Sequence, residues 1–71
     1  MQVPHPHDVK WFEEEIKKIP QNMRYFAEEK YKEVFRETYE KHEGKISQLN
    51  LARKEANERL RLFVDKVTTK G

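Results

Sequence analysis

Residues 49–67, with the sequence LNLARKEANERLRLFVDKV, decide the fold because they carry two separate patterns on one helix. Apolar side chains recur there at steps of three and four residues, as one face of a helix requires. We call them the apolar row: Leu49, Ala52, Ala56, Leu60, Phe63 and Val67. A second set, on nearly the opposite side, is the polar row: Asn50, Lys54, Asn57 and Arg61. The spacing predicts a helix that buries the apolar row and exposes the polar row.

A short amphipathic segment comes first in the folded part of the chain. Asp8 is a typical N-cap, and Pro20 cannot continue the segment, so we predict a helix over roughly residues 8–18. Its expected buried face is Val9, Phe12, Ile16 and Ile19.

A longer segment follows at once, because proline is well suited to the first position of a helix. We predict a helix over roughly residues 20–42, ended by Gly44 in the left-handed conformation. Its expected buried face is Met23, Ala27, Tyr31, Val34, Phe35 and Thr38, with Tyr39 at the margin. The last helix is expected from about Ser47 to Val67. The pattern therefore predicts an all-α, three-helix domain with a short first helix and two long ones.

The chain has 71 residues, which allows at most one domain. Residues 1–7, with two prolines, are expected to form a flexible arm, residues 8–67 the single helical domain, and residues 68–71 a tail or a linker to a further domain. Because a domain of this size buries only about 60% of its unfolded surface, we expect it to dimerise or to belong to a longer protein.

Composition narrows the function classes. The chain has no cysteine, which fits a reducing compartment, and we expect a cytoplasmic protein. Its longest apolar run, residues 62–64, is too short for a membrane span. The net charge is +2, but it is uneven: residues 1–43 hold 8 Lys+Arg and 10 Asp+Glu, whereas residues 44–71 hold 7 and 3. A field that attracts nucleic acid would come from the last third.

Catalytic and metal-binding patterns are weak. His5, His7 and Asp8 lie close in sequence but lack a fourth ligand at a defined spacing. The carboxylates of residues 13–15 point about 100° apart on a helix, so they cannot converge on one substrate atom. Gly44 and Gly71 do not form a phosphate-binding loop. We therefore expect no enzyme activity, no metal site, no cofactor and no small-molecule substrate.

The polar row favours double-stranded DNA as a partner. It contains no acid, although the protein is rich in acids, and Asn and Arg can hydrogen-bond the edges of adenine and guanine. We predict that Asn50, Lys54, Asn57 and Arg61 read base edges in the major groove. Phosphate contacts are predicted for the basic residues near this row: Lys45, Arg53, Arg59 and Lys66. The alternative is an ordinary solvated helix face.

Several apolar residues lie off the predicted buried faces: Trp11, Tyr25, Phe26, Leu51 and Leu62. On so short a chain they indicate a core wrapped from two sides or a subunit interface, and we predict a symmetric homodimer that would match paired or palindromic DNA sites. Aromatic anchors also suit a protein–protein interaction module, such as an oligomerisation domain or a small inhibitor, that binds no nucleic acid.

The sequence resembles a helical segment of phage and mobile-element replication initiator proteins. The resemblance covers roughly residues 19–63. It rests on Pro20, Tyr31 and Phe35, followed by the run Ala52-Arg53-Lys54-Glu55-Ala56-Asn57-Glu58-Arg59-Leu60-Arg61. The nuclease and helicase parts of that family have no counterpart in this sequence, so no catalytic residue carries over. The resemblance implies a non-catalytic module of a replication initiator, or of a protein that targets the same origin.

Overall fold

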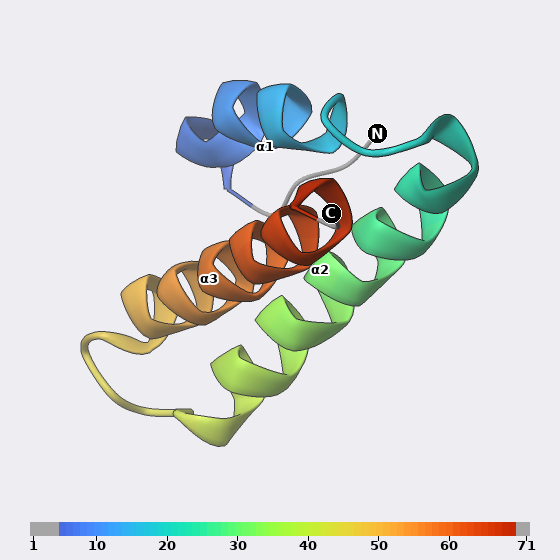
Figure 1. The fold of residues 1–71 in the computed structure, drawn as a ribbon. Helices are drawn as coiled ribbons and strands as arrows, with labels where there is room; N and C mark the ends of the chain where they lie inside the picture. Colours follow the sequence, from blue (N-terminus) through green and yellow to red (C-terminus); the bar gives the residue numbers. More distant parts are fainter. Residues whose placement is uncertain (1–4, 70–71) are drawn as a thin grey trace.

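The computed structural model describes residues 5–69, and they fold into three α-helices preceded by one 3₁₀ turn (Figure 1). The elements are η1 (Pro6–Asp8), α1 (Val9–Ile16), α2 (Gln21–Lys41) and α3 (Gln48–Thr68). No strand occurs within residues 5–69. The predicted all-α fold, with one short and two long helices, is confirmed.

Helices α2 and α3 form an antiparallel hairpin that makes up most of the molecule (Figure 1). Their facing sides hold the core, where α2 contributes Ala27, Tyr31 and Val34, and α3 contributes Ala52, Ala56, Leu60 and Val64. The two alanines of α3 are fully buried. The alanine side chain is small, so the side chains of the neighbouring helices can fill the space beside these two positions.

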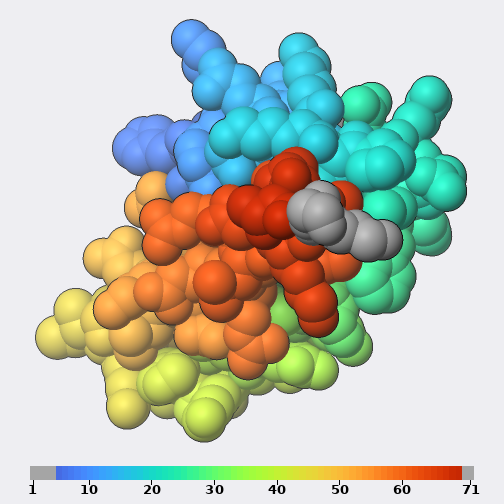
Figure 2. All heavy atoms as spheres, in the orientation of Figure 1, coloured from blue at the N-terminus to red at the C-terminus, as the bar shows by residue number. Residues whose placement is uncertain are grey.

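Helix α1 lies across one side of this hairpin and contacts both α3 and α2 (Figure 2). It closes the core with Phe12 and Ile16, joined by Ile19 from the turn that follows. The ring of Phe12 lies 4.8 Å from that of Tyr31, measured between centroids. Three of the four residues expected on the buried face of the first helix are therefore buried, and Val9 is half-buried.

The connections explain where the helices end. Pro20 lies just before α2, at its N-cap. The Arg24 side chain donates hydrogen bonds to the carbonyl oxygens of Ile19 (3.1 Å) and Lys17 (3.3 Å), so it satisfies two backbone groups of the turn between α1 and α2. Gly44 has a φ of +87°, the left-handed conformation expected for it.

Two residues predicted to cap helices make no capping hydrogen bond. Asp8 and Ser47 do occupy N-cap positions, of α1 and α3, but neither side chain makes a capping hydrogen bond. Residues 6–8, expected to be extended or to start the first helix, form the 3₁₀ turn η1 instead. Residues 1–4 of the expected arm, and residues 70 and 71 of the expected tail, lie outside the described residues.

The apolar row was predicted to be buried, and this is correct for Ala52, Ala56 and Leu60, whereas Phe63 and Val67 are half-buried. Leu49, expected to be buried, is 41% exposed, whereas Val64, which the row omitted, is only 1% exposed. Val64 shares a side of α3 with Arg53 and Asn57, at spacings of eleven and seven residues, and α1 covers that side. The buried face is therefore wider than a two-helix contact requires, and it is shifted toward α1.

None of the helices within residues 5–69 has the length and apolar character that crossing a membrane demands.

Candidate functional site

The polar row of α3 divides into an exposed part and a part that holds the fold together. Asn50, Lys54 and Arg61 are exposed, whereas Asn57 is half-buried. An open groove between α1 and α3 is lined by Asp8, Trp11, Lys54, Asn57, Glu58 and Arg61. The structure thus brings three members of the row together beside an aromatic ring, and it adds two carboxylates that the sequence pattern did not place there.

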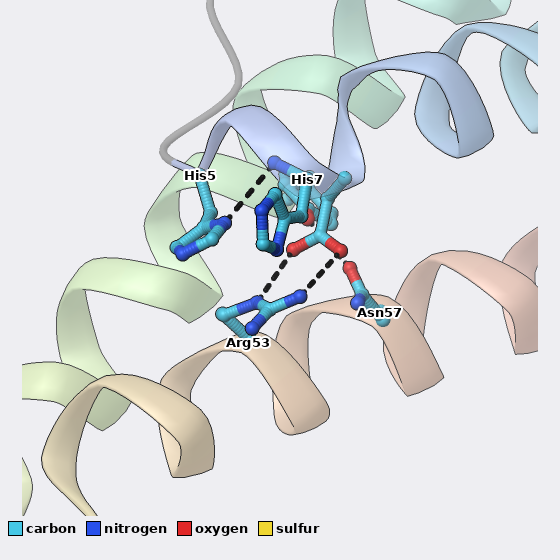
Figure 3. Close-up of polar contacts among 6 residues, drawn as sticks. His5, His7, Arg53 and Asn57 are labelled. Carbon is cyan, nitrogen blue, oxygen red and sulfur yellow. Dashed lines mark hydrogen bonds and ion pairs between the residues drawn. The ribbon is translucent and has the colours of Figure 1, made fainter.

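An ion pair between Asp8 and Arg53 joins the start of α1 to α3 (Figure 3). The guanidinium donates from Nε to Oδ2 (3.0 Å) and from Nη2 to Oδ1 (3.2 Å), so both carboxylate oxygens accept a bond. Asp8 is 7% exposed, and Arg53 is half-buried. Arg53 was predicted to contact phosphate, and here two of its nitrogens are bound within the protein. Sequence spacing offered no sign of this pair, because the residues lie 45 positions apart.

The ionised form of Asp8 is favoured in the folded state. Burial raises the pKa of its carboxyl, but the hydrogen bond and positive charge of Arg53 outweigh burial, with a smaller contribution from the Asn57 side chain. The net effect is a pKa below the usual value of 3.8. Asp8 is therefore a charged structural group at neutral pH, paired in a bidentate geometry that gives both strength and direction.

Asn57 takes part in the same cluster from the α3 side. The Tyr31 hydroxyl donates a hydrogen bond of 2.5 Å to Asn57 Oδ1, which connects α2 to α3 (Figure 3 shows Asn57 beside the ion pair). Burial of Tyr31, together with the nearby charge of Asp8, raises the pKa of its hydroxyl. The oxygen of Asn57 is thus already bonded, although this residue was predicted to read a base edge.

Replacing Tyr31 by Phe tests this polar cluster. The change removes one hydrogen bond without opening a cavity, so the free energy of unfolding should fall by about 0.5–1.5 kcal/mol in urea titrations. Tyr39→Phe, on the exposed part of α2, is the matched control and should change stability by less. Equal effects of the two changes would show that the Tyr31–Asn57 bond contributes nothing specific.

The remaining predicted phosphate contacts do not share one surface. Arg59 lies on the α2 side of α3, where its Nε donates to Glu55 Oε2 at 3.0 Å, and it lines a hollow against α2. Lys45 lies in the loop between α2 and α3, and Lys66 is exposed near the C-terminal end of α3. The eight predicted DNA contacts are therefore spread over several sides of the helix and its ends.

The five predicted interface residues also separate into groups. Tyr25, Phe26 and Leu62 are exposed, whereas Trp11 and Leu51 are half-buried. Trp11 packs against the core and lines the groove of the polar row. Phe26 lies instead against Phe63, at 5.9 Å between ring centroids, on the side of the hairpin where α2 meets α3.

Within residues 5–69, no group of three or more His, Cys, Asp or Glu side chains is arranged to hold a metal ion. The Nδ1 atom of His5 accepts a hydrogen bond from the backbone nitrogen of His7 (3.1 Å; Figure 3), and the Asp8 carboxylate is bound to Arg53.

Comparison with known proteins gave no match of any kind: no family model fits the sequence, and no curated protein or solved structure resembles the chain significantly.

Proposed function

We propose that this chain is a non-catalytic module that binds double-stranded DNA through the exposed part of the polar row and that it dimerises. The observation that carries the proposal is the position of Asn50, Lys54 and Arg61, which are all exposed along α3. Within residues 5–69, neither Lys54 nor Arg61 belongs to an ion pair of the folded structure. Their charges are available to a polyanion.

The dimensions of α3 suit the major groove. The three residues span eleven positions, or roughly 16 Å along the helix at 1.5 Å per residue. A single helix fits into a major groove about 12 Å wide. In this arrangement Lys54 and Arg61 contact phosphates or the edge of guanine, and Asn50 is placed to bond adenine. Arg53 and Asn57 act indirectly, because they hold α1 against α3.

The biological setting we propose is a module of a phage or mobile-element replication initiator, or of a protein that targets the same origin. The support is the resemblance of residues 19–63, together with the basic last third of the chain. A dimer would present two polar rows to paired half-sites, as symmetric DNA-binding proteins do.

The test is a fluorescence anisotropy titration of the protein with duplex DNA at two salt concentrations. Affinity should fall as salt rises, because each neutralised phosphate releases counterions. Replacing both Lys54 and Arg61 by Gln should weaken binding to all sequences and flatten the slope of log affinity against log salt by about one unit for each lost charge.

Lys41→Gln, an exposed change at the end of α2, is the matched control and should leave the slope unchanged. Absence of binding at low salt, or equal slopes for the double variant and the control, would overturn the DNA proposal.

A second candidate function is protein–protein interaction without nucleic acid. The observation that favours it is Phe26, an aromatic ring that is 58% exposed beside an apolar hollow. Exposed aromatic residues over such a hollow are typical anchors of protein interfaces. The titration above separates the two functions, because a pure interaction module would not bind duplex DNA at any salt concentration.

A further inference from the structure

The side of the α2–α3 hairpin away from α1 is an uncovered groove. A hollow of about 40 Å³ lies between α2 and α3 there, and its walls are Phe26, Ala27, Lys30, Tyr31, Arg59, Leu60 and Phe63. No residue of α1 takes part in it. The molecule measures 42 × 22 × 16 Å. A helix with its side chains is about 10–12 Å across, so the smallest dimension is too short for three layers of helices, with one on each side of the hairpin. One groove is therefore filled by α1, and the other is open.

A second hollow continues the groove toward the loop of residues 42–47. Arg59 lines both hollows, so they adjoin one another. The walls of the second one on α2 include Val34, Glu37 and Thr38. Along this open side, a projecting aromatic ring therefore lies at one end, and a recess with a mainly charged and polar lining lies about three helical turns away.

The charges of the groove follow a polarity along its length. Lys30 on α2 pairs with Glu33 (3.1 Å), and Arg59 on α3 pairs with Glu55 (3.0 Å). Because the two helices are antiparallel, both acids lie one turn closer to the connecting loop than their cations do. This side of the hairpin thus carries a positive row, Lys30 and Arg59, and beside it a negative row, Glu33 and Glu55. Glu33 lies at the outer edge of the groove and does not line its two hollows.

We propose that a second copy of this chain occupies the groove, antiparallel to the first, around a twofold axis that crosses the groove between the two rows. In that register residue 30 of one copy faces residue 33 of the other, so each positive row meets a negative row. Phe26 falls opposite position 37, beside the second hollow of the partner. A second face-to-face dimer is possible, with its twofold axis along the groove. It would place Lys30 of one copy against Arg59 of the other, so the repulsion of like charges disfavours it.

The inference rests on the dimerisation part of the proposed function and locates its interface. It leaves Lys54 and Arg61 outside the interface, because they line the groove between α1 and α3, and Asn50 shares their side of α3 by helical spacing. The two polar rows of such a dimer run antiparallel and stay accessible. It also separates Phe26 from Tyr25, which is 73% exposed but points about 100° away on the same helix.

Sedimentation velocity of the isolated protein, without DNA, gives the first test. Phe26→Ser should weaken the dimer at least about tenfold, because it removes an exposed aromatic anchor that occurs twice in the symmetric interface. Tyr25→Ser, a matched change at the adjacent exposed aromatic, should leave the dissociation constant within about twofold. Both side chains are exposed, so circular dichroism melts of dilute samples should show that each variant still folds.

A charge-exchange experiment tests the register. Lys30→Glu and Glu33→Lys should each weaken self-association, since each places like charges across the axis. An equimolar mixture of the two variants should form a heterodimer that is at least about tenfold tighter than either homodimer. Neither variant retains the pair within its own α2, so this recovery can arise only between chains.

The inference would be overturned if the protein were a monomer at every concentration, or if Phe26→Ser left the dissociation constant of the dimer unchanged. It would also be overturned by a mixture that associates no better than its components. None of these results depends on DNA. The anisotropy titration therefore tests DNA binding by the polar row independently of them.

Discussion

Phe12→Ala should lower the free energy of unfolding by about 3–5 kcal/mol, the usual cost of truncating a fully buried aromatic side chain. Phe12 is 0% exposed, and its ring packs against Tyr31 between α1 and the hairpin. A chain of 71 residues has a total stability of roughly 4–11 kcal/mol. The change should therefore remove a large share of the total stability and lower the urea concentration at the unfolding midpoint.

Urea titration followed by circular dichroism measures this effect. Tyr25→Ala is the matched control, because it truncates an aromatic residue that is exposed, and it should change stability by no more than about 0.5 kcal/mol. If the two variants unfolded at the same urea concentration, α1 would not be part of the cooperative core.

Asp8→Asn should produce the second-largest effect, a loss of about 1–3 kcal/mol at neutral pH. The amide keeps the size of the side chain but removes the charge that holds the half-buried Arg53 guanidinium. Glu55→Gln removes a carboxylate from the exposed pair with Arg59 and should cost at most about 1 kcal/mol. The difference between the two variants measures what burial adds to an ion pair.

The difference in unfolding free energy between the wild type and Asp8→Asn should depend on pH. The pKa of Asp8 is lower in the folded state than in the unfolded chain, so the carboxylate stabilises the fold fully above about pH 4. This stabilisation is lost as the pH falls through the folded pKa, because the native carboxyl is then protonated. Wild type and Asp8→Asn should therefore converge in stability below pH 4. A constant difference down to the acid limit would contradict the role given to Asp8.

The fold was predictable because each helix carries its own signals. Pro20 and Gly44 separate the helices, and spacings of three and four mark the faces that Phe12, Tyr31 and Leu60 bury. Such patterns describe one helix at a time. They show that a face is apolar, but they do not show where a third helix crosses the other two.

Several of the unpredicted features follow from the position of α1. It covers the side of α3 that bears Arg53, Asn57 and Val64, so a valine outside the apolar row is buried, and two polar residues become internal partners. Leu49, at the far end of α3, lies beyond that cover and is exposed. The sequence places Lys54 in the polar row and Arg53 beside it, but it gives no sign that Arg53 is paired within the protein. Only the approach of Asp8, from 45 residues away, separates their roles.

The hairpin formed by α2 and α3 has a consequence for the order in which the chain folds. Its helices are connected by residues 42–47 alone, and the Tyr31–Asn57 bond spans 26 positions, against 45 for the Asp8–Arg53 pair. Contacts between residues that are close along the chain close smaller loops and form sooner. We therefore expect the α2–α3 hairpin to form before the Asp8–Arg53 pair fixes the start of α1 against α3.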